Sequence, residues 1–206
     1  MLLCRAGRML IGIDQEYQEA RSALADMDWA ALSRRIGCQP MDNGLALPFF
    51  QQIHQVSPDG CVGPDSQPAT AAVGLVLCRY VLRFPPQPLP QGPRITFREL
   101  TDSGPLVARF ADNTLKIITT TFGRRGEDLL AAAIRLGGRR EANGAFDLFL
   151  RFEALPHVPL FLQFNAADDL FPAQAALLFH CSAETYLDLR SLFILGTYLT
   201  GRLITA

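Results

Sequence analysis

The sequence predicts a single α+β domain over residues 1–206, in which an antiparallel sheet packs against several helices. The chain is 49% apolar and 19% charged, which suits one well-filled core and excludes intrinsic disorder. Candidate strands gather towards both ends of the sequence, with candidate helices between them, as in α+β proteins. A short connection, Leu155–His157, joins two of the later strands, and this favours an antiparallel pair.

The N-terminal quarter is expected to begin with a helix. Residues 1–13 are expected to be disordered or poorly packed. An amphipathic helix is predicted over 14–36, with a break near Asp26, which is a candidate cap for the second segment. Gly37 supplies the stop, because glycine readily takes the left-handed conformation that ends helices.

A strand pair and a helix are predicted next. The apolar run 44–50 and the weakly alternating run 52–56 are expected to be short strands, and the turn residues Ser57–Gly60 follow the second one. A helix is predicted over 66–83, with Ser66 as its candidate cap. Five prolines within 85–93 then predict an extended loop inside the domain.

The remaining elements complete the α+β order. Residues 94–100 are expected to be extended, and helices are predicted over 106–122 and 126–136, although the β-branched residues of the former also suit a strand. Alternating and continuous apolar patterns then predict the final elements. These are strands over 146–152, 158–164 and 175–180 and a two-piece helix over 182–203.

Composition excludes several classes of protein. The formal net charge is −1, so the sequence predicts no binding of nucleic acid. The five cysteines are an odd number without Cys-x-x-Cys spacing, which favours free thiols in a reducing compartment and predicts no metal site. Arg5 and Arg8 interrupt the apolar start, and no stretch is long enough for a membrane span. A soluble cytoplasmic protein is therefore expected.

Common catalytic and nucleotide-binding motifs are missing from the sequence, so candidate site residues come from smaller patterns. Asp168 and Asp169 are adjacent carboxylates on a predicted loop, suited to a hard cation, to mutual pKa shifts or simply to a solvated turn. Arg98 and Glu99 suit either anion binding or structural pairing. His180 ends the last predicted strand and precedes a cysteine, an arrangement that suits a nucleophile only if the fold brings the two side chains together.

An ordered series of short motifs resembles an uncharacterised prokaryotic family, domain of unknown function 3786. The resemblance covers roughly residues 16–203. The motifs are Leu47-Pro48-Phe49, Leu77-Cys78-Arg79-Tyr80, Pro88-Leu89, Thr96-Phe97-Arg98-Glu99-Leu100, Phe122-Gly123, Leu136-Gly137-Gly138, Leu155-Pro156-His157-Val158-Pro159-Leu160, Asp168-Asp169-Leu170-Phe171-Pro172 and Leu177-Leu178-Phe179.

The resemblance implies a context rather than a mechanism. Some members of this family are joined to a small cysteine-rich iron–sulfur module, which implies an accessory role in anaerobic redox or one-carbon metabolism and an iron–sulfur or corrinoid protein as partner. The 206 residues contain no such cysteine-rich segment, and they carry His180 where the family pattern has an acid and Asn165 near an expected Trp. The family supplies no established catalytic residues, and the cofactor, if any, stays unknown at this point.

Three functions follow as hypotheses. The first is a non-catalytic accessory or binding module that recognises a protein partner or a small cofactor. The second is an enzyme of unknown reaction with a loop-borne acidic site built from Asp168 and Asp169, with Arg98, Glu99 and His180 nearby. This second hypothesis requires those residues to share one cleft. The third is an oligomer-forming structural protein with an apolar patch buried between subunits.

Overall fold

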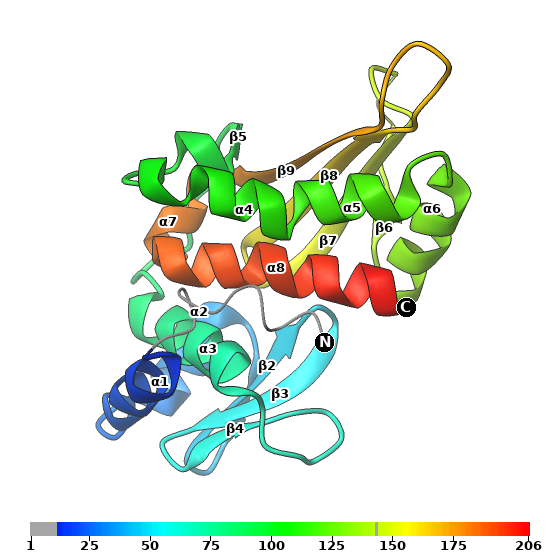
Figure 1. Cartoon of the computed structure of the whole chain (residues 1–206). Helices are drawn as coiled ribbons and strands as arrows, with labels where there is room; N and C mark the ends of the chain where they lie inside the picture. Colours follow the sequence, from blue (N-terminus) through cyan, green and yellow to red (C-terminus); the bar gives the residue numbers. More distant parts are fainter. Residues whose placement is uncertain (1–11, 143) are drawn as a thin grey trace.

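Two antiparallel sheets lie on opposite sides of the long C-terminal helix α8 (Leu189–Thr205) in the computed structural model, which describes residues 12–142 and 144–206 (Figure 1). The smaller sheet is a four-stranded meander: β1 (Gln39–Met41), β2 (Gly44–Phe49), β3 (Gln52–Ser57) and β4 (Gly60–Val62). The larger sheet has the order β5-β9-β8-β7-β6: β5 (Arg94–Thr96), β9 (Gln174–His180), β8 (Val158–Asn165), β7 (Leu148–Leu155) and β6 (Arg139–Arg140). The predicted α+β class with antiparallel pairing is confirmed.

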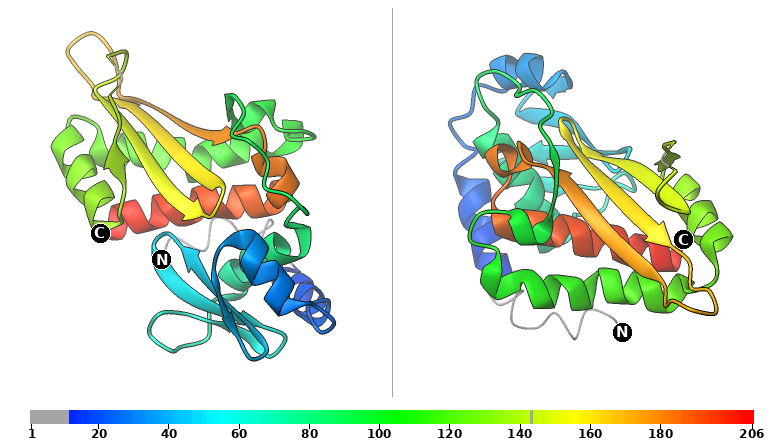
Figure 2. Two further views of the ribbon diagram at one scale, coloured as in Figure 1. Left: turned by 180° about the vertical axis from the view of Figure 1, so that it is seen from behind. Right: turned by 90° about the horizontal axis from the view of Figure 1, so that it is seen from above.

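The helices fill the space beside and between the sheets. The other α-helices of the described chain are α1 (Ile13–Ser22), α2 (Trp29–Ile36), α3 (Ala71–Arg83), α4 (Val107–Asn113), α5 (Leu115–Phe122), α6 (Gly126–Arg135) and α7 (Ala183–Tyr186). Figure 2 shows α4, α5 and α8 on one face of the five-stranded sheet, while the opposite face carries no helix of the described chain. Helix α3 lies against the other side of α8 and joins it to the smaller sheet.

Helix α8 is the central element of the core. Asp188 caps it, because its carboxylate accepts a hydrogen bond from the Ser191 N–H at 2.8 Å. Most of its length is buried, and it contacts α3, α4, α5, α6 and α7. Gly196 allows α4 to come close, because an added Cβ there would lie 2.5 Å from the Phe110 ring. That ring is stacked on Phe97 with their centroids 4.0 Å apart, so it has little room to retreat.

Several predicted boundaries are corrected by local hydrogen bonding. The 14–36 helix is two helices, and the cap of the second is Asp28 rather than Asp26, because Asp28 accepts from the Ala31 N–H at 2.9 Å. Helix α3 begins at Ala71, where Thr70 caps it, instead of at Ser66, which has a positive φ of 62°. The predicted helix over 182–203 is two helices, α7 and α8: Asp188 caps α8 with its side chain, whereas Ser182 makes no side-chain cap bond before α7.

The structure also differs from the prediction at three short strands, at the end of β5 and near the N-terminus. β1, β4 and β6 were not predicted, since two or three residues carry too little pattern to be recognised. Thr96 is followed by a short 3₁₀ turn, Phe97–Glu99, rather than by further strand. Most of the predicted 1–13 segment lies outside the described residues, but Ile13 is the buried first residue of α1.

The cysteines that the structure describes are free thiols, as expected from their spacing: Cys38, Cys61, Cys78 and Cys181. Within residues 12–142 and 144–206, no helix has both the length and the apolar character that a bilayer crossing requires.

The close approach of α4 to α8 predicts a contrast between two glycines of the same helix. Gly196→Ala should lower the free energy of unfolding by about 1–3 kcal/mol, because the new methyl group meets a ring that cannot move away. Gly201→Ala meets nothing within 4 Å and should be neutral or stabilising by up to ~1 kcal/mol, because alanine favours helices. Urea unfolding of both variants measures the difference, and equal stabilities would contradict this account of the packing.

Candidate functional site

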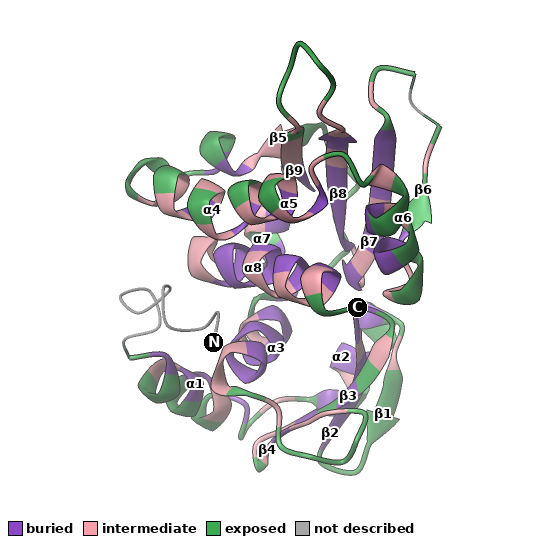
Figure 3. Ribbon diagram, turned by 45° about the vertical axis from the view of Figure 1, so that its right-hand side comes forward, coloured by how far each residue is buried: buried purple, intermediate pink, exposed green. Residues whose placement is uncertain are grey.

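The loop between β8 and β9 carries the predicted carboxylate pair and projects from the body of the protein (Figures 1 and 3). Asp168 organises this loop. One of its carboxylate oxygens accepts the Leu170 N–H at 2.8 Å and the Phe171 N–H at 2.7 Å. Its own N–H donates to the Phe171 carbonyl at 3.0 Å. These bonds, chiefly those from the Phe171 and Leu170 amides, hold the pKa of Asp168 below its usual value.

Asp169 has a different environment from its neighbour. Its side chain is 94% exposed and forms an ion pair with Arg124 at 3.1 Å. Arg124 also donates to the Asp168 carbonyl at 3.2 Å, so the same guanidinium group braces the loop from the end of α5. The two carboxylates therefore make separate contacts: Asp168 binds amides inside the loop, and Asp169 binds Arg124 at the end of α5. They do not point at one common ligand position.

Arg98 and Glu99 lie in the 3₁₀ turn after β5. The Glu99 carboxylate accepts from both the N–H and the hydroxyl of Thr96, each at 2.7 Å. These two hydrogen bonds lower the pKa of Glu99. Glu99 thus closes a capping box, while the exposed Arg98 uses its carbonyl to accept the Ser103 hydroxyl at 2.8 Å.

His180 lies at the buried end of β9, on the face of the sheet that carries no helix. Its Nδ1 lies 2.6 Å from the Gly92 carbonyl, so the ring joins β9 to the proline-rich loop. The edge of the ring meets Phe161, with centroids 5.2 Å apart. His180 is 6% exposed, and it acts as a structural link at this end of the sheet.

The five predicted residues do not lie in one cleft. Thr96 pairs with Leu178, which is about 13 Å along β9 from Gln174 at ~3.3 Å per residue. The loop with Asp168 lies beyond Gln174, and Figure 1 shows β5 and this loop at opposite ends of β9. Among the described residues, no three His, Cys, Asp or Glu side chains come together as a metal-binding group.

Sequence reasoning overlooked the two residues that follow the carboxylates. Leu170 is 83% exposed and Phe171 is 63% exposed, although both are large apolar side chains. Their exposure follows from the turn that Asp168 enforces, because that turn directs the chain outwards at the tip of a projecting hairpin. The signal in the sequence is Leu170-Phe171-Pro172 two residues after Asp168, a residue type that favours turns.

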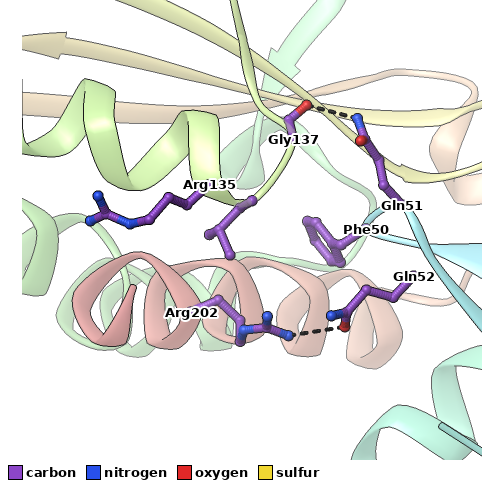
Figure 4. A pocket seen from close by; sticks show the side chains of 7 residues that line it. Phe50, Gln51, Gln52, Arg135, Gly137 and Arg202 are labelled. Atoms are coloured by element: carbon purple, nitrogen blue, oxygen red, sulfur yellow. Dashed lines mark hydrogen bonds between the residues drawn. The ribbon is translucent and has the colours of Figure 1, made fainter. Parts of the chain in front are cut away.

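A cavity that the sequence did not reveal lies where three distant segments meet (Figure 4). Phe50, Gln51 and Gln52 line it from the β2–β3 turn, residues 135–137 from the end of α6, and Arg202 from α8. Its volume is about 200 Å³. Gln51 Nε2 donates to the Gly137 carbonyl at 2.8 Å, which ties the smaller sheet to α6. We call this space the Arg202 cavity.

A second cavity, at the start of α6, has its arginines already engaged. It is lined by Arg124, Arg125 and Arg140 together with three acidic residues. Arg124 is paired with Asp169, Arg125 binds Asp128 at 3.3 Å, and Arg140 donates to the Asp147 carbonyl at 2.9 Å. Each of these arginines therefore binds an acidic residue, and the surface has no concentrated positive charge.

The fold and these sites define an α+β domain with a projecting apolar loop and a small cavity, and without a shared cleft for the predicted acidic site. The sequence profile of the family described as Domain of unknown function (DUF3786) matches residues 28–202. The chain therefore belongs to this family, as the motif series indicated. Comparison with curated proteins found no match, and comparison with solved structures found none either.

The turn at Asp168 predicts a local effect of its removal. Asp168→Ala should speed amide hydrogen exchange at Leu170 and Phe171 by roughly tenfold, because loss of two charge-assisted hydrogen bonds opens the turn. Asp169→Ala removes only an exposed ion pair and should leave both amides within about twofold of their original rates. If the two variants exchange alike, the turn does not depend on Asp168.

The same hydrogen bonds set the acid limit of the loop. A carboxylate with a lowered folded-state pKa contributes its stabilisation at pH values above its unfolded-state pKa, and this contribution is lost as pH falls through the folded-state value. The Leu170 and Phe171 amide shifts should therefore stay constant on acidification and then change together below the usual Asp range. An NMR titration checks this, and a transition at or above the usual Asp pKa would contradict it.

Proposed function

We propose that this protein is a cytoplasmic accessory module that binds a partner protein through the apolar tip of the β8–β9 loop. The observation that carries the proposal is the exposure of Leu170 and Phe171, at 83% and 63%, on a turn fixed in the free protein. Large apolar side chains at the centre of a contact supply most of the binding free energy. A loop that is ordered beforehand loses less conformational entropy on binding.

The charges around the tip indicate the chemistry of the partner. Asp169 carries an exposed carboxylate beside Leu170, paired on one side with Arg124 at 3.1 Å, whereas the Asp168 carboxylate faces the loop amides. A complementary surface has an apolar pocket for Leu170 and Phe171 with a basic residue at its rim. The acidic residues also disfavour an anionic lipid surface as the partner.

The family context names the first partners to test. The motif resemblance links relatives to iron–sulfur modules, so an iron–sulfur or corrinoid protein of anaerobic redox or one-carbon metabolism is the first candidate within this proposal. The acidic-enzyme hypothesis receives no similar support, since its residues lie at opposite ends of β9. Nucleic acid is not part of the proposal, because the chain has a net charge of −1.

A site-specific cross-linking experiment tests the proposed contact. A photoreactive phenylalanine analogue replaces Phe171, and a matched protein carries it at Ile134, which is 60% exposed on α6. Irradiation in anaerobic native extract should give a discrete cross-linked protein from position 171 and not from position 134. Equal products from both positions, or none from 171, would count against the proposal.

The identified partner then allows a quantitative prediction. Leu170→Ser combined with Phe171→Ser should weaken binding at least ~10-fold, because two apolar side chains lose their burial in the complex. Ile134→Ser should leave the affinity within about twofold. Calorimetry or surface-based binding measures both, and unfolding curves of the variants check that the fold is intact. An undiminished affinity of the double variant would refute the assigned contact.

A further inference from the structure

The Arg202 cavity combines a half-buried guanidinium group with a lining that contains no carboxylate. Arg202 comes from the last turns of α8, and its side chain reaches the β2–β3 hairpin (Figure 4). Arg135 also lines the cavity, but Figure 4 shows its guanidinium group directed away from Phe50 and Gln52. Arg202 is therefore the cation that faces the shared space between the three segments.

Protein contacts fix the position of Arg202 and leave part of its hydrogen-bonding capacity unused. Nη1 donates to the Tyr198 hydroxyl at 2.8 Å and to the Gln52 side-chain oxygen at 3.3 Å. No ion pair within the described residues includes Arg202. Nη2 and Nε have no hydrogen-bond partner among the described residues, and the planar edge of a guanidinium group matches the two oxygens of a carboxylate.

The other side of the cavity is apolar. Phe50 contributes its ring, which packs against Tyr198 with centroids 5.2 Å apart, and Leu136 also lines the cavity. A volume of about 200 Å³ equals that of roughly seven water molecules at ~30 Å³ each. An occupant of this size has room for a carboxylate and a chain of a few carbon atoms.

The backbone of the β2–β3 turn is strained in a way that builds this wall. Phe50 has φ 47° and Gln51 has φ 62°, values that bulky residues seldom adopt. Tertiary contacts stabilise the turn: the Phe50 N–H donates to the Ala154 carbonyl at 2.9 Å, and Gln51 binds Gly137. Strain of this kind is concentrated at ligand sites, where it holds a side chain in its binding position.

We propose that the Arg202 cavity binds a small carboxylate with a short apolar chain. Arg202 accepts the carboxylate through Nη2 and Nε, Gln52 holds the guanidinium group in place, and the chain lies against Phe50 and Leu136. This proposal concerns the binding of a small molecule, and it is independent of the partner contact proposed for the β8–β9 loop.

NMR titrations with simple probes test the proposal. Butyrate should shift the backbone amides of Gln51, Gln52 and Gly137. Butyramide, which has the same shape without the charge, should not. Acetate should bind roughly three- to tenfold more weakly than butyrate, because it lacks the apolar chain. Inorganic phosphate, as a second anion, should bind more weakly than butyrate.

Two arginine variants separate the assigned residue from general charge. Arg202→Gln should weaken butyrate binding at least ~10-fold, while Arg34→Gln, at an exposed arginine of α2 that does not line the cavity, should leave it within about twofold. Arg202→Lys keeps the charge without the planar edge and should give an intermediate loss, so it serves if Arg202→Gln does not fold. Equal binding of butyrate and butyramide would overturn the proposal. Tighter binding of phosphate, undiminished binding by a folded Arg202 variant, or shifts confined to other residues would each do so as well.

Discussion

The burial of helix α8 between the two sheets is the constraint on which the rest of the structure depends. Its apolar residues face α4 and α5 on one side and α3 on the other. Each large side chain that is fully buried contributes about 1.5–3 kcal/mol, so this one helix supplies a large part of the core. Helices α5 and α6 contact the larger sheet and α3 contacts the smaller one, and α8 contacts all three of these helices.

The two candidate sites, the Arg202 cavity and the β8–β9 loop, differ in how closely they are connected to the core around α8. The Arg202 cavity forms directly on α8, where the end of that helix meets the β2–β3 turn and the end of α6. The β8–β9 loop lies beyond the sheet that α8 supports, and it is held by local bonds to Asp168 and by Arg124. The first site is therefore coupled to the packing of the core, whereas the second depends on a turn that is largely self-contained.

The sequence predicted what depends on short-range patterns. The apolar alternation around 148–152 and the acidic start and glycine end of α6 led to correct elements, because the spacing of neighbouring residues decides them. The sequence also identified Asp168 as a residue of interest, yet it could not show that Leu170 and Phe171 would be exposed, since apolar residues are usually assigned to the core. Arg202 and Phe50 are far apart in the chain, and only the tertiary fold places them at one cavity.

The β2–β3 turn explains why this cavity is hard to recognise from sequence. Two-residue hairpin turns with positive φ at both positions usually contain Asn-Gly or a similar pair, and a Phe-Gln pair gives no such signal. Here the conformation is imposed from outside, by Ala154 of the larger sheet and by Gly137. An alanine at position 137 would displace the end of the Gln51 side chain and would have to keep a φ of 75°, so the glycine after α6 suits both the helix end and the contact with the turn of the other sheet. The Phe50-Gln51 turn thus has a conformation that its own residues disfavour, and the long-range contacts that hold it also form the cavity wall. This mismatch between local sequence and backbone conformation distinguishes the site.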